Sequence, residues 1–169
     1  MKTKCSIRKM QESDIKNLSQ GFISQGWPGR EEILARYFLE QKSKEREVLV
    51  AEIDGVVAGY ITILPDAKQG PFAGMAPELS DFNVFEPFQN QGIGNLLMEE
   101  AEKRVKLVSD KVTLGVGLHS GYGPAQRLYI RRGYIPDGSG VWYQNHRPAM
   151  DATCEDIGDL VLYLSKDLI

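Results

Sequence analysis

Apolar residues recur at two different spacings in the first half of the chain. Between residues 14 and 38 they return every three to four positions, and turn residues at 26–29 divide this stretch, which predicts two amphipathic helices. Between residues 48 and 64 they form nearly continuous runs on either side of Asp54-Gly55, a dipeptide that favours a tight hairpin turn. The predicted elements are, in chain order, a strand at 6–9, helices around Ile15–Phe22 and Glu31–Phe38, and strands at 48–53 and 56–64.

The second half continues the succession of strands and helices after a loop rich in glycine and proline at 65–77. Its strongest helical signal is an apolar stripe at 92–108, where Glu99, Glu100 and Glu102 each stand four residues before a lysine or arginine on a face expected to be solvated. The predicted elements are a strand at 78–85, this helix, a strand at 111–118, a short helix at 124–132, and one or two strands, the last at 159–165. This order predicts an α/β fold, with a mixed sheet and helices on both faces.

Length and composition fit a small globular protein with one domain at 1–169. The chain is 42% hydrophobic and 25% charged, and no apolar run approaches the roughly 20 residues that a membrane span needs. Its start has no apolar signal segment, so we expect a cytoplasmic protein without a membrane partner. A net charge of -3 without a basic run argues against nucleic-acid binding. Cys5 and Cys154 lack metal-ligand spacing, so we expect neither a metal site nor a disulfide.

A glycine-containing segment stands between the predicted strand at 78–85 and the long helix. It reads Gln89-Asn90-Gln91-Gly92-Ile93-Gly94-Asn95. The start of a helix leaves about four backbone N–H groups without helical partners, and the helix dipole adds partial positive charge there, so such a segment can bind phosphate without lysine. A dinucleotide-binding motif would need a third glycine at Leu97, and a P-loop would need Gly-Lys-Ser or Gly-Lys-Thr. Both of these alternatives are excluded by the residues present.

About thirty residues later a second motif reads Ala125-Gln126-Arg127-Leu128-Tyr129, and its short helix ends at Gly133-Tyr134. Together with Gln89-x-x-Gly92-x-Gly94, it resembles the GNAT superfamily of acetyl-CoA-dependent N-acyltransferases. The resemblance extends to the order of the predicted elements, and so to nearly the whole chain. It implies a mostly antiparallel central sheet in which the strands at 78–85 and 111–118 splay apart.

The resemblance also implies how acetyl-CoA, the co-substrate, would bind. Residues Gln89 to Asn95 would hold the CoA pyrophosphate, the backbone around Val84 and Phe85 would pair with the pantetheine amides, and Gln126 is a further expected cofactor contact. Tyr129 would donate a proton to the departing CoA thiolate. Many members carry an asparagine three residues before the alanine of the second motif, and Tyr122 replaces it here.

The chemistry requires a group that removes a proton from the amine. A lysine-like amine has a pKa near 10.4, so only a small fraction is neutral and nucleophilic at pH 7. Asp81 is the preferred base because it shares a strand face with Asn83 among apolar residues, whereas Glu78, His119 and a water chain are alternatives.

The acceptor is expected to be a primary amine of a small molecule. Trp27 and Trp142 are the predicted walls of its site, with a core position as the alternative for each. Acetylation of a protein N-terminus or lysine, and an acyl-CoA binding module without turnover, are the alternative functions. A homodimer is left open.

Overall fold

The computed structural model describes residues 4–169 in two compact units. The first comprises the residues up to Leu64 together with Ser80–Arg104, and the second comprises Pro65–Leu79 and Val105–Ile169. Chain length predicts a single domain, and the division into two compact units leaves this a prediction. The elements of the first unit are β1 (Cys5–Lys9), α1 (Asp14–Ser24), α2 (Glu31–Lys42), β2 (Glu47–Ile53), β3 (Val56–Leu64), most of β4 (Glu78–Val84), the short 3-10 helix η1 (Glu86–Phe88) and nearly all of α3 (Ile93–Lys106).

The second unit begins with the loop at 65–77 and the first two residues of β4. It then contains, in chain order, β5 (Lys111–Gly117), the 3-10 helix η2 (Ser120–Tyr122), α4 (Gly123–Arg131), β6 (Ile135–Tyr143) and β7 (Leu160–Asp167). No helix within residues 4–169 combines the length and the apolar character that crossing a membrane requires.

The seven described strands are hydrogen-bonded in the order β1-β2-β3-β4-β5-β7-β6. Of the pairs whose register is described, β4 with β5 is parallel and the others are antiparallel. This confirms the predicted mixed sheet of mostly antiparallel strands. The parallel register joins Glu78 to Thr113 and Leu79 to Leu114, and β5 pairs along its whole length with β7.

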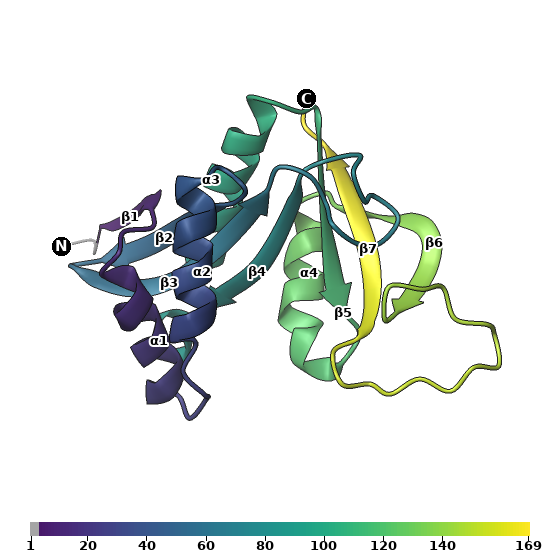
Figure 1. The fold of residues 1–169 in the computed structure, drawn as a ribbon, viewed down its shortest axis with the longest axis horizontal. Coiled ribbons are helices and arrows are strands. Elements are labelled where there is room, and N and C mark those ends of the chain that lie inside the picture. The colour runs from purple at the N-terminus through teal and green to yellow at the C-terminus, as the bar shows by residue number, and fades with distance from the viewer. Residues whose placement is uncertain (1–3) are drawn as a thin grey trace. The chain divides into compact units, whose positions relative to one another are not determined.

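Both faces of β2 are covered in the first unit. Four consecutive residues, Val48 to Ala51, have no exposed surface, and successive strand residues point to opposite faces. Figure 1 shows α1 and α2 in front of these strands and α3 behind them. The apolar runs that predicted the hairpin are therefore continuous because neither face meets solvent, and Asp54 and Gly55 have the positive φ values that its turn requires.

Gly59 allows β3 and β4 to approach closely. A Cβ atom at this position would lie 2.3 Å from the backbone oxygen of Asn83 and 2.9 Å from Cα of Val84. The backbone of β4 is therefore held against β3 at the point where the chain leaves the strand for η1 and the glycine-containing segment.

Two expectations for the long helix are corrected. The helix ends at Lys106 instead of 108, and Leu107 and Val108 are about 80% exposed. Of the three predicted ion pairs, those of Glu99 with Lys103 and Glu100 with Arg104 are described, and Lys106 donates a hydrogen bond to the backbone oxygen of Ile169. Glu102 is 8% exposed, so the helix is buried over a wider arc than the apolar stripe indicates.

Candidate acyl-CoA site

The segment before α3 turns sharply into the helix through two residues with positive φ. Asn90 and Gly92 have φ values of 60° and 82°, and a Cβ atom placed on Gly92 would meet nothing within 4 Å. The first helical hydrogen bond runs from the N–H of Leu96 to the oxygen of Gly92, at 3.2 Å. The N–H groups of residues 93–95 thus belong to the first turn, where the helical pattern supplies no acceptor. These groups and the open space beside Gly92 fit a diphosphate.

The charge around this turn also fits an anion. α3 has no acidic residue in its first turn, so no carboxylate of its own helix competes for the positive end of the dipole. Two glutamine side chains brace the loop instead. Gln89 Nε2 donates to the oxygen of Val84 at 2.9 Å, and Gln91 Nε2 donates to the oxygen of Pro87 at 3.0 Å. Gln89 and Gln91 therefore hold the shape of the loop through its backbone.

Aromatic packing anchors the segment to the core of the first unit. Phe85 is 3% exposed, its ring meets that of Phe22 edge to face at 5.2 Å, and its N–H donates to the oxygen of Ala58. A Cβ atom on Gly21 would lie 2.4 Å from the Phe85 ring, so this glycine lets the ring lie against α1. Ile93 is buried as well, at 2% exposed. The Phe85 ring is thus structural, and the predicted pantetheine contact of Val84 and Phe85 stays a prediction for their backbone.

The largest difference from expectation at the site concerns Asp81. Its carboxylate accepts four hydrogen bonds: Oδ1 from Arg30 at 3.0 Å and from Asn83 at 2.9 Å, and Oδ2 from Arg30 and from Tyr37, both at 2.9 Å. The side chain is 16% exposed. Four accepted bonds occupy about all the lone-pair positions of a carboxylate. This geometry weighs against Asp81 as a proton acceptor, and the general-base assignment stays a prediction that the contacts do not favour.

Arg30, Tyr37 and Tyr60 are residues that the sequence analysis missed. Arg30 bonds both oxygens of Asp81 and the hydroxyl of Tyr60, and Tyr60 is fully buried. Burial, followed by the nearby Asp81 charge, raises the pKa of both Tyr37 and Tyr60 above the usual value, so both stay protonated. The hydrogen-bonded pairs Arg30–Tyr60, Tyr37–Asp81 and Arg30–Asp81 lie 30, 44 and 51 residues apart in the chain. No local pattern could have paired them, although an arginine beside a predicted helix start was visible.

The alternative bases are also engaged. The Nδ1 atom of His119 accepts a hydrogen bond from the N–H of Gly121 at 3.0 Å, which occupies the lone pair that a neutral imidazole would use. Glu78 lies in the second unit, where its charge contributes to raising the pKa of Tyr163 after the larger effect of burial. Neither arrangement marks a base held ready for the reaction.

Tyr129 lies on α4 in the second unit and is 7% exposed. Its ring packs against that of Tyr134 at 6.0 Å, and burial raises the pKa of its hydroxyl well above the usual value. Tyr129 therefore stays protonated at neutral pH and can donate a hydrogen bond. Gln126 on the same helix donates from Nε2 to the oxygen of Gly117 at 2.8 Å. Its amide thus joins α4 to the end of β5.

The two predicted acceptor walls lie in different units and differ in exposure. Trp27 is 60% exposed in the loop before α2, so it is a surface residue and not part of the core. Trp142 is half-buried on β6, donates from Nε1 to Ser139 Oγ at 2.7 Å, and meets the Tyr163 ring edge to face. The structure supports a packing role for Trp142. The acceptor role of each tryptophan stays a prediction.

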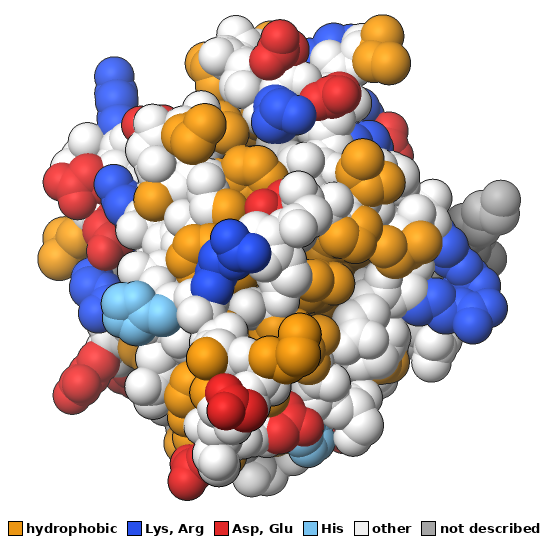
Figure 2. Space-filling model, turned by 90° about the vertical axis from the view of Figure 1, so that its right-hand side faces the viewer, with side chains coloured by type: hydrophobic (Ala, Val, Ile, Leu, Met, Phe, Trp, Pro, Cys, Tyr) orange, Lys and Arg blue, Asp and Glu red, His pale blue; other side chains and the backbone are white. Residues whose placement is uncertain are grey.

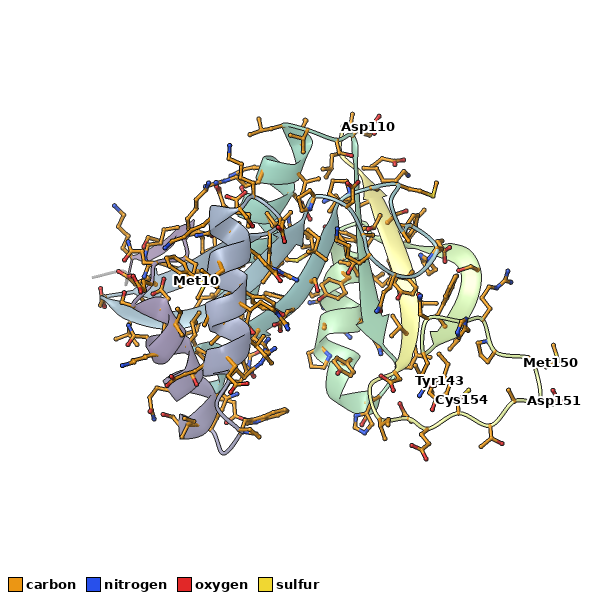
Figure 3. All side chains as sticks on the ribbon, viewed as in Figure 1. Met10, Asp110, Tyr143, Met150, Asp151 and Cys154 are labelled. Atoms are coloured by element: carbon orange, nitrogen blue, oxygen red, sulfur yellow. The ribbon has the colours of Figure 1, made fainter. Side chains whose placement is uncertain are left out.

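The long connection at 144–159 follows β6. Figure 3 shows Met150, Asp151 and Cys154 along this connection, and Met150 is fully exposed.

On the face shown in Figure 2, apolar side chains form a band, while lysine, arginine, aspartate and glutamate are scattered around it.

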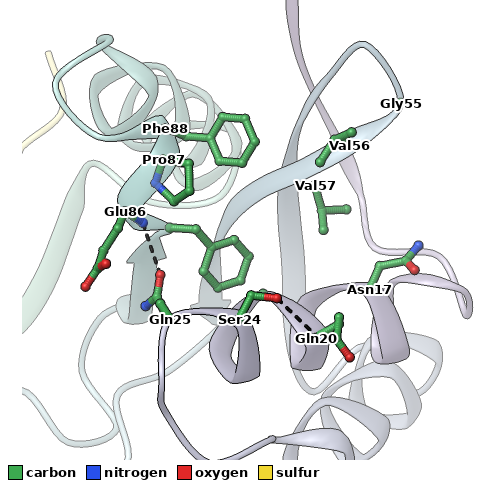
Figure 4. Close-up of a pocket in the computed structure, with 12 residues that line it drawn as sticks. Asn17, Gln20, Ser24, Gln25, Gly55, Val56, Val57, Glu86, Pro87 and Phe88 are labelled. Atoms are coloured by element: carbon green, nitrogen blue, oxygen red, sulfur yellow. Dashed lines mark hydrogen bonds between the residues drawn. The ribbon is translucent and has the colours of Figure 1, made fainter.

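A cavity of about 460 Å³ lies within the first unit (Figure 4). Polar side chains of α1 line one side and apolar side chains from η1 and the hairpin line the other, and Gln25 Oε1 accepts from the N–H of Glu86 at 3.1 Å. Of the predicted site residues, Phe85 alone is among its lining residues. The cavity therefore does not coincide with the predicted acceptor walls.

Comparison with known proteins identifies the family. Residues 13–134 match the model of the acetyltransferase (GNAT) family. An N-alpha-acetyltransferase of Sulfurisphaera tokodaii is 30% identical over 105 residues, a match that covers 58% of this chain and 63% of that relative. The chain thus spans less than two thirds of the length of this relative.

Solved structures share the fold at low sequence identity. An N-acetyltransferase from Staphylococcus aureus Mu50 has a TM-score of 0.75 at 14% identity, covering 99% of this chain and 100% of that one. The yncA protein from Salmonella typhimurium, solved with its cofactor acetyl-CoA, has a TM-score of 0.71 at 15% identity, covering 99% of this chain and 95% of that one. Because the family model spans well over half of its length, this chain belongs to the acetyltransferase (GNAT) family.

Proposed function

We propose that the protein is an N-acetyltransferase that moves the acetyl group of acetyl-CoA to a primary amine. The observation that carries the proposal is the loop before α3, in a chain of this family: positive φ values at Asn90 and Gly92, open space beside Gly92, and a first turn without acidic residues. In the proposed complex the N–H groups of residues 93–95 bind the diphosphate. Several converging amides are needed, because each charge interaction with a helix end contributes about 0.3–2 kcal/mol.

The chain's own residues have two further proposed roles. The backbone around Val84, at the end of β4, pairs with the pantetheine amides and orients the thioester. Tyr129 donates a hydrogen bond to the sulfur as the neutral amine attacks the thioester carbon and the carbon–sulfur bond breaks. Because burial raises the pKa of Tyr129, hydrogen bonding to the forming thiolate is favoured over complete proton transfer. The proton of the amine leaves to solvent water in this scheme, since the contacts of Asp81 and His119 disfavour both as bases.

Two classes of acceptor are proposed. A small-molecule amine is the first, as the sequence analysis expects. An α-amino group at a peptide or protein N-terminus is the second, and the name of the Sulfurisphaera tokodaii relative supports it. Lysine acetylation has no comparable support.

The test is thiol release from acetyl-CoA, measured with a panel of small polyamines, amino acids, peptides with free N-termini and the same peptides with blocked N-termini. Turnover with small amines alone supports the first class, and turnover that requires a free peptide N-terminus supports the second. Tight CoA binding without turnover on any acceptor would refute the proposed acetyl transfer. It would favour the alternative of an acyl-CoA binding module.

A further inference from the structure

Asp81 has an unusual backbone conformation for a strand residue. Its φ is +47°, in the left-handed region that residues with a side chain rarely adopt, although aspartate tolerates it better than most. It lies inside β4, two residues after the last residue that pairs with β5. A conformation of this kind persists only when surrounding contacts hold it.

Hydrogen bonds from three residues hold it here. Arg30, the residue before α2, bonds both carboxylate oxygens, and Tyr37 of α2 bonds one of them. Asn83, two residues further along β4, bonds the other oxygen and also donates to the hydroxyl of Tyr60 on β3. Arg30 also lies over the ring of Phe22 in α1, 5.1 Å from its centre. Arg30, Tyr37 and Asn83 thus hold Asp81 directly, and Tyr60 and Phe22 in turn contact Asn83 and Arg30.

The backbone that follows Asp81 leads directly to the proposed cofactor contacts. The backbone oxygen of Asn83 lies against Gly59, where a Cβ atom would not fit. The backbone oxygen of Val84 accepts the hydrogen bond from Gln89 Nε2 that braces the loop before α3. A change in direction at Asp81 would therefore move both the strand end and the loop. The four accepted hydrogen bonds occupy about all the lone-pair positions of the carboxylate, which disfavours it as a proton acceptor, and two of them join the strand to Arg30.

We infer that Arg30 and Asp81 are positioning residues, which hold the left-handed turn of β4 and so aim the strand end at the thioester. This inference rests on the proposed function, because it assigns to the two residues a role in acetyl-CoA binding. Asp81 acts through its backbone conformation and not as a proton acceptor.

Four substitutions test the inference. Asp81→Gly and Asp81→Asn remove the carboxylate but keep a residue that tolerates positive φ, while Asp81→Ala removes the carboxylate and places a residue that tolerates positive φ poorly. We expect Asp81→Ala to raise the KM for acetyl-CoA roughly 5- to 30-fold. This factor is the equilibrium ratio that corresponds to the strain energy of an alanine in the left-handed conformation. Asp81→Gly and Asp81→Asn should raise it less, and should keep kcat within about tenfold with an unchanged pH profile. Arg30→Lys, which cannot bond both oxygens in the same way, should also raise the KM.

Arg8→Lys is the matched control. Arg8 bonds Asp14 and Glu52 in the same unit, neither of which belongs to the loop before α3 or to β4, and Asp14 is 1% exposed. This variant should lower the melting temperature about as much as Arg30→Lys without changing the KM for acetyl-CoA.

The outcomes separate the two claims. A wild-type protein that neither binds nor turns over acetyl-CoA refutes the proposed function and the inference with it. An active wild type in which Asp81→Asn and Asp81→Gly lose about 100-fold or more in kcat, together with the acid limb of the pH profile, refutes the inference alone. Equal KM values for the glycine and alanine variants would refute it as well.

Discussion

Replacing Gly92 by alanine isolates the contribution of the loop before α3. Gly92 has a φ of 82°, and a Cβ atom there would meet nothing within 4 Å, so the change adds backbone strain without a steric clash. The strain of a left-handed alanine is about 1–2 kcal/mol, and the smaller conformational freedom of the unfolded chain offsets about 0.4–1 kcal/mol of it. We expect a loss of roughly 1 kcal/mol in the free energy of unfolding, which lowers the melting temperature of a chain of this size by about 2–4 °C.

The same strain weakens binding if the loop relaxes to escape it. Binding must then restore the original conformation, so the Kd for acetyl-CoA should rise by about 5- to 30-fold, which corresponds to 1–2 kcal/mol. Gly55 offers a matched control, because its φ is 81° and its Cβ position is equally open, but it lies in the β2–β3 hairpin. Gly55→Ala should lose similar stability and keep the wild-type Kd.

Titration calorimetry with acetyl-CoA and thermal unfolding of both variants provide the two readouts. Equal Kd values for Gly92→Ala, Gly55→Ala and the wild type, at similar losses of melting temperature, would show that acetyl-CoA does not use the conformation at Gly92. The reasoning about the loop would then be wrong.

Three further predictions follow from buried groups. Tyr129→Phe should lower kcat more than tenfold in steady-state assays with little change in the KM for acetyl-CoA, as expected when a hydrogen bond forms mainly in the transition state, and an unchanged kcat would remove Tyr129 from the mechanism. Gly59→Ala should destabilise the protein by about 1–3 kcal/mol in urea unfolding, because its Cβ would lie 2.3 Å from the oxygen of Asn83, and wild-type stability would contradict the close approach of the two strands. Burial raises the pKa values of Tyr37, Tyr60 and Tyr129, so above pH 10 these tyrosines ionise in the unfolded chain first and the folded state holds more protons. Below pH 10 these tyrosines should not change the free energy of unfolding, and above it each should lower that free energy by about 1.4 kcal/mol per pH unit. Unfolding curves that coincide at pH 9 and pH 11 would refute this.

Local patterns predicted most of the fold. The helical spacing before Phe22 and the Asp54-Gly55 turn gave elements whose bounds agree with α1, β2 and β3 to within one or two residues. β6 was less visible, since Gly138 and Gly140 interrupt it with positive φ values and its pairing with β7 shifts register between Pro136 and Val141. Glycines inside a strand weaken the alternation on which sequence interpretation depends.

The site divides in the same way. The turn from Gln89 to Gly94 into α3 could be predicted because it is local: its glycines and its helix are contiguous in the chain, while its phosphate-binding role stays a prediction. The environment of Asp81 could not, because its partners come from residues up to 51 positions away, and an alternating strand pattern does not reveal what faces a polar side chain. The same pattern that suggested a base lining the site fits a carboxylate held by Arg30 equally well.

Amide resonances of an isotopically labelled protein, followed while coenzyme A is added, test the central claim most directly. If the turn before α3 binds the diphosphate, the amide signals of Gly92, Gly94 and Asn95 should shift strongly with coenzyme A. They should shift little with pantetheine, which lacks the diphosphate. Signals of these three residues that stay in place at saturating coenzyme A, or that respond equally to pantetheine, would contradict the account.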